Sequence, residues 1–386
     1  MAGWLDPLQT QKRPDFAEFS IALAAGFALA FTTLFFAFQL TGRLGGSRDF
    51  VGYWAAGRQL VHHANPYDHD AVSALEHTVG LDARAALVMR NPPWALPLAY
   101  PLGFFSLRVA AIPWSLLLFA CLFGSVQILR RLHGSPPNRI HWLALSFTPA
   151  LICLTIGQTS LILLFGLVLF LRFHKTRPFA AGAALYLCAF KPHFFLPFAL
   201  VLMVWIVVSR SYRILAGGVT ALTAGSLIAA WIDPAAWFQY THYMHTSGIA
   251  HEFTADLGNL LRDFVHPDWE WLAFVPAILG CLWALGYFWP RRRHWNWLEH
   301  GSLLMLVSLL VAPFGWIFDQ SLAIPALLDG AYTTRSRKLL ALLALVILVM
   351  DIQNFLIPVP SPLWLWPAPV LLVWYLLATH RRQPTR

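Results

Sequence analysis

Charged residues are scarce in this sequence. Lys, Arg, Asp and Glu together make up 12% of its 386 residues, whereas hydrophobic residues make up 58%. A soluble domain carries roughly 25% charged residues, so this composition excludes an ordinary soluble protein. Apolar runs recur along the chain, and many approach the ~20 residues that a helix needs to cross a membrane. We therefore predict an all-α fold: a polytopic transmembrane helix bundle that forms one integral membrane domain over residues 1–386.

Cysteine is also rare, and its spacing points to no metal or redox chemistry. The chain has four cysteines, all inside apolar runs and none in a CxxC pair: Cys121, Cys153, Cys188 and Cys281. Structural zinc sites and redox-active dithiols use closely spaced pairs. We therefore expect these four side chains to pack in the core.

The sequence lacks the motifs of soluble nucleotide-using and hydrolytic enzymes. It has no glycine-rich phosphate loop and no G-x-S-x-G. Asp68-His69-Asp70 spells DxD but follows a Pro-Tyr turn, which favours a loop feature or at most a second acidic contact. Three histidines, His242, His245 and His251, lack the spacing and carboxylate partner of a metal motif and favour polar loop or acceptor contacts. None of these residues requires a metal or a cofactor.

The basic residues set the expected orientation. The net charge is +9, but Lys and Arg occur in short clusters between apolar runs, which is typical of cytoplasmic loops and argues against nucleic acid as a partner. We predict a multi-pass protein of the cell membrane with both termini in the cytoplasm. About twelve spans are expected, at residues 21–40, 109–129, 140–156, 158–172, 178–190, 194–208, 214–232, 271–289, 301–317, 319–332, 339–356 and 363–379.

Two polar regions fall on the outer side in this topology. Residues 41–108 predict short amphipathic helices near 49–63, 68–80 and 82–90, followed by a proline-rich interfacial or re-entrant segment. Residues 233–270 form a second outer loop rich in His, Tyr and acidic residues. These two regions hold 11 of the 18 acidic residues, so we expect the active site on the outer face.

Asp49 is the strongest candidate for a general base. It lies in the stretch Ser47 to Asp70, where Asp49, Tyr53 and Ala56-Gly57 recur at helical spacing beside the first span. The alternative is a plain capping role, since a carboxylate at a helix start stabilises the helix dipole.

Three polar positions interrupt apolar runs at the same predicted face. Lys191-Pro192-His193 suits an anionic phosphate, although a lysine there can also snorkel to the interface. Asp319-Gln320 and Gly157-Gln158 separate other pairs of runs, and Gln158 can also simply bond neighbouring helix ends. The role of Asp351, inside an apolar run, stays open.

The sequence resembles the GT-C superfamily of membrane glycosyltransferases, in particular glycosyltransferase family 87, the polyprenyl-phosphate-mannose-dependent alpha-mannosyltransferase-like proteins. The resemblance runs over most of the chain, and its individual motifs are short. They are Asp49-Phe50 with Tyr53, Ala56-Gly57-Arg58, Asn65-Pro66-Tyr67-Asp68, Asn91-Pro92-Pro93 with Pro101-Leu102, Gly157-Gln158, Lys191-Pro192, and Ala312-Pro313 with Trp316 and Asp319.

The resemblance implies transfer of a hexose, with mannose favoured, from a polyprenyl-phosphate donor to a lipid or glycan acceptor. Asp49 would deprotonate the acceptor hydroxyl, and the anomeric carbon would be inverted. The leaving phosphate would be held by Lys191, Arg58 and Arg262. Further substrate contacts are expected from Tyr53, Tyr67, Asp68, Gln158, His193, His251, Asp256, Trp316, Asp319 and Gln320.

A polytopic secondary transporter or flippase of a lipid-linked or small polar substrate is the alternative. Twelve spans, proline-broken helices and an intramembrane Lys and Asp would suit such a protein. Against it, the sequence shows no symmetry between its halves, and its polar residues cluster at one face.

Overall fold

The computed structural model describes residues 48–81, 86–247, 253–357 and 361–380. Every regular element within these ranges is helical, which confirms the all-α prediction. The predicted first span, residues 21–40, lies outside the described residues.

Each apolar run from residue 109 onward overlaps a helix. The apolar helices are α5 (Leu107–Leu132), α6 (Thr148–Ile156), α7 (Ser160–Phe173), α8 (Pro178–Cys188), α9 (Leu196–Ser209), α10 (Tyr212–Ile232), α13 (Val275–Phe288), α14 (Trp297–Leu310), α15 (Ile324–Thr333), α16 (Arg337–Leu356) and α17 (Pro367–Thr379). Short 3-10 turns extend several of them: η3 (Ile140–Ser146), η4 (Pro192–Phe195), η6 (Glu270–Phe274), η7 (Trp289–His294), η8 (Ile317–Ala323) and η9 (Pro362–Trp364).

Five stretches among the described residues are long and apolar enough to cross a membrane by themselves. They are Leu107–Leu132, Pro192–Ser209, Tyr212–Ile232, Glu270–His294 and Pro362–Thr379. The helices α7, α8 and α14 are apolar but shorter, with 14, 11 and 14 residues. The protein is therefore a polytopic helical membrane protein in which full-length and short apolar helices pack together.

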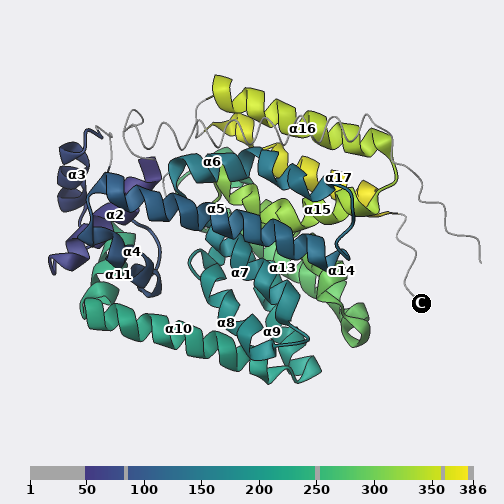
Figure 1. Ribbon diagram of the computed structural model, residues 1–386, viewed down its shortest axis with the longest axis horizontal. Helices are drawn as coiled ribbons and strands as arrows, with labels where there is room; N and C mark the ends of the chain where they lie inside the picture. Colours follow the sequence, from purple (N-terminus) through teal and green to yellow (C-terminus); the bar gives the residue numbers. More distant parts are fainter. Residues whose placement is uncertain (1–47, 82–85, 248–252, 358–360, 381–386) are drawn as a thin grey trace, which may run out of the picture.

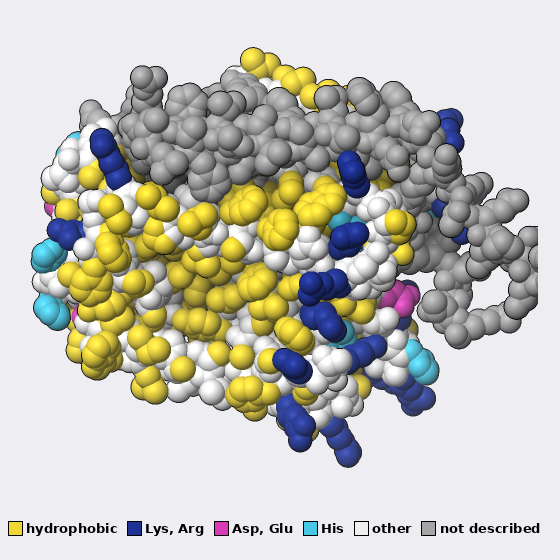
Figure 2. Space-filling view, viewed as in Figure 1, with side chains coloured by type: hydrophobic (Ala, Val, Ile, Leu, Met, Phe, Trp, Pro, Cys, Tyr) yellow, Lys and Arg dark blue, Asp and Glu magenta, His cyan; other side chains and the backbone are white. Residues whose placement is uncertain are grey.

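The two ends of the bundle differ in charge. Most of the helices run side by side along the long axis of the molecule (Figure 1). Hydrophobic side chains cover the middle of the surface, and Lys and Arg gather at one end (Figure 2). We call this the basic end; it carries Arg130, Arg131, Arg172, Lys175, Arg177, Arg210, Arg213, Arg291, Arg292 and Arg293, which lie where α5, α7, α9 and α13 finish and α8 and α10 begin. We call the opposite end, where α5, α7, α9 and α13 begin, the site end.

The first polar region supplies two helices at the site end. They are α2 (Arg48–Val61) and α3 (His69–Thr78), close to the predicted ranges. The third predicted helix, near 82–90, is wrong for residues 86–90, which have no regular structure. The reason is that the backbone amides of this segment donate to side chains of α3 and not to one another. Leu87 N donates to Glu76 Oε1 at 2.8 Å, and Ala86 N donates to His69 Nε2 at 3.4 Å.

The proline-rich segment folds as three short turns, η1 (Pro93–Ala95), α4 (Leu96–Ala99) and η2 (Tyr100–Phe104), because its prolines interrupt any longer helix. The segment lies directly against α2. A Cβ at Gly57 would come 2.3 Å from the carbonyl oxygen of Ala99, and one at Gly103 would come 2.0 Å from that of Gly57. Only glycine at both positions allows this contact between the two backbones.

The second polar region contains two helices, α11 (Ala236–Thr246) and α12 (Leu257–Val265), where we predicted a loop. The polar side of α12 is buried: Asn259 is 0% and Arg262 4% exposed, whereas Phe264 is 89% exposed. Leu260 and Val265 are exposed as well. A helix that turns leucine, valine and phenylalanine outward is typical of contact with lipid at the membrane interface.

Candidate functional site

Three helix interruptions meet at the site end, and each has a local cause. Gly157 ends α6 with a left-handed φ of 80°, which puts Gln158 between α6 and α7. Lys191 follows α8 and precedes Pro192, which begins η4. Asp319 lies in η8, where its Oδ2 accepts a hydrogen bond from the backbone N–H of Trp316 at 3.2 Å. Each interruption places a polar side chain between two apolar helices, and hydrogen bonds bring the three side chains together.

Gln158 connects the carboxylate of Asp49 to the ammonium of Lys191. Its Nε2 donates to Asp49 Oδ2 at 2.7 Å, and its Oε1 accepts from Lys191 Nζ at 3.2 Å. A carboxylate only accepts and an ammonium only donates, so these two partners fix the orientation of the amide. Asp49 in the first turn of α2 and Lys191 after α8 are thus two hydrogen bonds apart, although 142 positions separate them in the sequence.

Lys191 is held mainly by Asp319. Its Nζ lies 2.7 Å from Asp319 Oδ1, and the two side chains are 15% and 2% exposed. Ser160 Oγ also donates to Asp319 Oδ1, at 2.5 Å, and accepts from Lys191 Nζ at 3.4 Å. The ammonium lies 5.0 Å from the ring centre of Phe318. A buried ion pair of this kind needs such additional hydrogen bonds to offset its desolvation.

Tyr53 closes the network from α2, one helical turn after Asp49. Its hydroxyl donates to Gln158 Oε1 at 3.0 Å and lies 3.4 Å from Thr159 Oγ1. Its ring packs at 5.2 Å from that of Trp114, which in turn bonds the carbonyl of Gly157. Burial raises the pKa of Tyr53 above its ordinary value, so this hydroxyl remains a neutral donor at working pH.

A second polar cluster lies beside the first. Asp256 caps α12 by accepting from Asn259 N at 2.8 Å, and Thr254 donates to the same carboxylate. Asn259 Nδ2 lies 3.4 Å from the carbonyl of Pro313. Burial is the largest influence on Asp256 and raises its pKa. These contacts dock α12 on the loop that leads to Asp319.

Other predicted site residues line or flank this region. Arg262, on the buried side of α12, pairs with Asp263 at 3.2 Å. The ring of His193 is tilted against that of Phe194, with ring centres 4.3 Å apart, and its ring centre is 6.5 Å from that of Phe314. Trp316 stacks on Phe318 at 6.0 Å. Gln320 Oε1 is buried and has no hydrogen-bond partner.

The remaining predicted residues do not join the network. Arg58 donates to the carbonyl of Gly103 at 2.9 Å and lies nine residues after Asp49, roughly 13 Å along α2. Tyr67 donates to the carbonyl of Asn91 and packs against Tyr240 at 5.4 Å. Asp68 is the N-cap of α3. His251 lies outside the described residues.

Sequence reasoning missed Ser160 and Asn259. Ser160 lies two positions after Gln158 at the start of an apolar helix, where a serine is easily taken for a helix-start residue. Asn259 was hidden because 233–270 was interpreted as a loop. The sequence of α12 alternates Asn and Arg with Leu and Phe at helical spacing, and this pattern could have predicted an amphipathic helix with a polar face that includes Asn259.

The described residues contain another buried polar network, at the basic end. His133 Nδ1 lies 2.8 Å from His141 Nε2, and His133 Nε2 lies 3.7 Å from Asp329 Oδ1. Tyr375 donates to Asp329 Oδ2 at 2.8 Å, and the ring of Tyr332 stacks on His133 at 4.6 Å. This cluster joins the ends of α5, η3, α15 and α17.

Comparison with known proteins gives one match. A sequence model of glycosyltransferase family 87 matches residues 90–313, which include Gln158, Ser160 and Lys191 but neither Asp49 nor Asp319. No curated protein and no solved structure matches the chain. Because the match covers more than half of the sequence and the structure is a polytopic helical bundle, the chain belongs to glycosyltransferase family 87 and is a membrane glycosyltransferase.

Proposed function

We propose that the protein transfers a hexose, mannose by preference, from a polyprenyl-phosphate donor to a hydroxyl of a lipid or glycan acceptor at the site end. The observation that carries this proposal is the hydrogen-bonded chain Asp49–Gln158–Lys191. It holds a carboxylate base and a cation side by side, on rigid helix ends, within a bundle that stands in lipid.

In the proposed step, Asp49 accepts the proton of the acceptor hydroxyl as its oxygen attacks the anomeric carbon. The bond from that carbon to the phosphate oxygen breaks on the opposite face, so the configuration inverts. The proton ends on Asp49, and the electron pair leaves with the polyprenyl phosphate. Gln158 Nε2, 2.7 Å from Asp49 Oδ2, orients the carboxylate for this transfer.

Lys191 would stabilise the charge that builds on the leaving phosphate. Its Nζ donates to Asp319 at 2.7 Å, to Gln158 at 3.2 Å and to Ser160 at 3.4 Å. The two longer bonds are the ones that a phosphate oxygen would replace, while Asp319 keeps the ammonium in position. A fixed cation in a site that excludes water stabilises a leaving anion strongly.

The test uses purified protein in lipid nanodiscs with polyprenyl-phosphate mannose and, separately, the glucose and arabinose analogues. Release of polyprenyl phosphate is measured for the wild type and for Asp49→Asn over a panel of lipid and glycan acceptors. Asp68→Asn is the matched control, because Asp68 is an exposed helix cap on the neighbouring α3.

Turnover by the wild type and the control, with loss in Asp49→Asn, is expected, and the accepted donor then identifies the sugar. Equal turnover by Asp49→Asn would remove Asp49 from the mechanism. Movement of an intact lipid-linked sugar across the bilayer without its consumption would instead support the flippase alternative.

A further inference from the structure

Two backbone carbonyl groups, those of Ala189 and Phe190, lie between the end of α8 and Lys191. The last carbonyls of a helix have no intrahelical donor. Pro192 adds none, because proline lacks an N–H. The N–H of Phe194, which would bond Phe190 in a continuous helix, donates instead to the carbonyl of Lys191 at 3.3 Å. The carbonyls of Ala189 and Phe190 therefore depend on donors from elsewhere in the fold.

Two side chains from residues 91–94 supply these donors. Asn91 Nδ2 donates to the carbonyl of Phe190 at 2.9 Å. Trp94 Nε1 donates to the carbonyl of Ala189 at the same distance of 2.9 Å. Two prolines lie between the donors, and because a proline ring fixes φ, the backbone that presents them is restrained before the contact forms. One stiff segment thus holds both consecutive carbonyls.

Tyrosine side chains hold residues 91–94 in turn. The hydroxyl of Tyr186, on α8, donates to the carbonyl of Trp94 at 2.6 Å, so the end of α8 and this segment bond each other in both directions. The hydroxyl of Tyr67 donates to the carbonyl of Asn91 at 3.1 Å. Asn91 is 4% exposed and Tyr67 2%, and a buried polar group that loses its partner costs more than the bond itself contributes. The arrangement therefore resists displacement of the chain next to Lys191.

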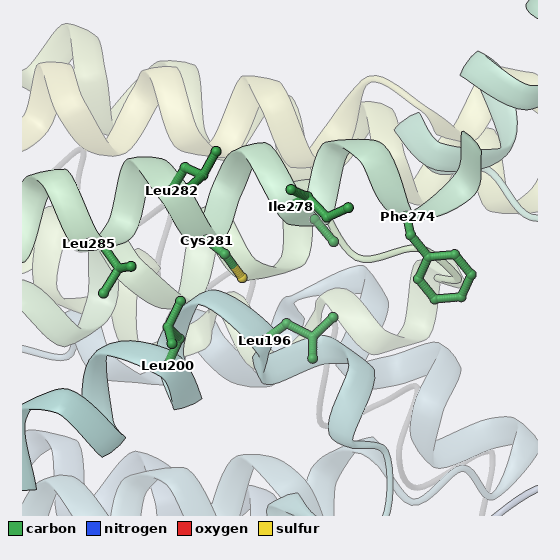
Figure 3. A pocket seen from close by; sticks show the side chains of 8 residues that line it. Leu196, Leu200, Phe274, Ile278, Cys281, Leu282 and Leu285 are labelled. Atoms are coloured by element: carbon green, nitrogen blue, oxygen red, sulfur yellow. The ribbon is translucent and has the colours of Figure 1, made fainter. Parts of the chain in front are cut away.

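The chain that follows Lys191 has apolar neighbours on one face. Leu196 and Leu200, on α9, line one side of an apolar groove of about 390 Å³ whose other side is α13 (Figure 3). Apolar contacts are non-directional, whereas hydrogen bonds have preferred distances and angles. The directional contacts to the chain immediately before Lys191 come from residues 91–94.

Lys191 needs such control, because its ammonium stands at the end of a flexible four-carbon side chain. Its place in the site-end network depends on bonds of 2.7 Å to Asp319 and 3.2 Å to Gln158. A misplacement of about 1 Å in a group that acts on the transition state can cost about 10²-fold in rate.

We propose that Asn91 and Trp94 are positioning residues: through the carbonyls of residues 190 and 189 they set where the ammonium of Lys191 meets the leaving phosphate. The inference rests on the proposed function, in which Lys191 has that task, and adds two residues that act on the reaction through the backbone. Both belong to the first polar region, so the part of the chain that carries Asp49 also controls the cation on the opposite side of the reaction.

The test compares Trp94→Phe with Trp374→Phe in the full-length protein in nanodiscs. Trp374 is the matched control, because its Nε1 donates to the carbonyl of Leu339 at 2.8 Å, between α17 and α16. Both changes remove one indole hydrogen bond to a backbone carbonyl and keep an aromatic ring. Asn91→Leu, a second variant, removes the other donor at similar size. Initial rates of polyprenyl phosphate release against donor concentration give kcat and KM, and hydrogen–deuterium exchange is followed on peptides that cover residues 186–196.

Trp94→Phe should lower kcat about tenfold and leave the donor KM within about twofold, since Lys191 acts on charge that develops in the transition state. Asn91→Leu should lower kcat by up to about 10²-fold. Backbone exchange over residues 186–196 should be faster in both variants. Trp374→Phe should keep the exchange and the kcat of the wild type.

A double-mutant cycle separates positioning from a general loss of structure. Trp94→Phe is combined with the pair Lys191→Met and Asp319→Leu, which leaves no buried charge without its partner. Without the ammonium, loss of the Trp94 bond has nothing to misplace, so kcat should fall no further. A fall in that background as large as in the wild type would overturn the positioning role.

Faster exchange with unchanged kcat in Trp94→Phe and Asn91→Leu would also overturn it and leave the proposed transfer intact, because the bonds would then serve the fold alone. Unchanged exchange together with unchanged kcat would do the same, since the chain beside Lys191 would not depend on these donors. No turnover by the wild type with any donor would overturn the proposed transfer and the positioning role together.

Discussion

Two of the buried polar networks among the described residues, one at the site end and one at the basic end, differ in composition and in how they are built. The network at the site end joins Asp49, Tyr53, Gln158, Ser160, Lys191 and Asp319, and the one at the basic end joins His133, His141, Asp329, Tyr332 and Tyr375. Each links several helices. At the site end, Gln158, Ser160, Lys191 and Asp319 lie at interruptions between apolar runs, where the chain could have continued as a helix.

The basic-end network lies where helices finish in any case. His133 caps α5, and Tyr375 and Asp329 face each other across α17 and α15. These groups satisfy one another and tie helix ends together. We infer that the site-end network serves chemistry, because it holds a carboxylate and an ammonium at helix interruptions, whereas the basic-end network ties helix ends together.

The strongest test of this comparison replaces one aspartate in each network by asparagine. Asp49→Asn should lower the rate of sugar transfer by about 10²–10⁴-fold, the usual contribution of a general base. Asp329→Asn should leave the rate per folded molecule unchanged. Initial rates of polyprenyl phosphate release, normalised to folded protein, measure both. A comparable loss of rate in Asp329→Asn would mean that the two networks are coupled.

Lys191→Met should affect both activity and stability. Transfer should fall about 10²–10³-fold because the leaving phosphate loses its cation. The free energy of unfolding should fall by roughly 3–5 kcal/mol, because the carboxylate of Asp319 stays buried without its ion-pair partner. Thermal unfolding in nanodiscs and initial rates give the two quantities.

The double variant Lys191→Met with Asp319→Leu is the control for that prediction. Removing both charges should restore most of the stability, since an apolar pair of similar size replaces a buried ion pair at little cost. Activity should stay low. Recovery of activity with stability would show that Lys191 serves only to hold the fold.

Gln158→Leu should give a smaller effect on rate with a distinctive pH dependence. The variant keeps Asp49 and Lys191 but removes the donor to the carboxylate, which stabilises its charged form. We expect about a tenfold loss of rate and a shift of the acidic limb of the pH–rate profile to higher pH. Gln158→Glu cannot donate to Asp49 and should not restore the wild-type profile; an unchanged acidic limb in Gln158→Leu would argue against a positioning role.

Tyr375→Phe should have the smallest effect. It removes one hydrogen bond to Asp329 in the basic-end network, which contributes on the order of 1 kcal/mol to stability. The rate of transfer should not change. A change in KM or kcat, with unfolding unaltered, would contradict the purely structural role that we assign to this network.

Much of the candidate site could be predicted, because burying a polar side chain in a membrane costs free energy unless it finds a partner. Gln158, Lys191 and Asp319 each stand between apolar runs, and a charged or amide side chain in such a place must find a partner. The alternation of apolar runs and polar residues therefore predicted the helices from residue 107 onward. It also singled out Gln158, Lys191 and Asp319, which the structure brings together. Asp49 and Tyr53 followed from their shared helical face.

The sequence could not indicate contacts that depend on how helices pack. Arginine is a residue type that commonly binds phosphate, yet the guanidinium of Arg58 donates a hydrogen bond to the carbonyl of Gly103. This contact forms because Gly57 and Gly103 allow η2 to pack closely against α2. The helix predicted near 82–90 is wrong over residues 86–90, because side chains of α3 offer hydrogen bonds that compete with helix formation.

The reversed polarity of α12 has a practical consequence for biochemistry on this protein. The exposed side chains of Leu260, Phe264 and Val265 call for a hydrocarbon environment, while the buried Asn259 contacts the carbonyl of Pro313 in the loop that leads to Asp319. Detergents that strip annular lipid would leave this helix without its solvent, and it would be the first part of the site to lose its support. Preparations that retain a bilayer, such as those extracted directly with polymer, are therefore the ones in which an absence of turnover is meaningful.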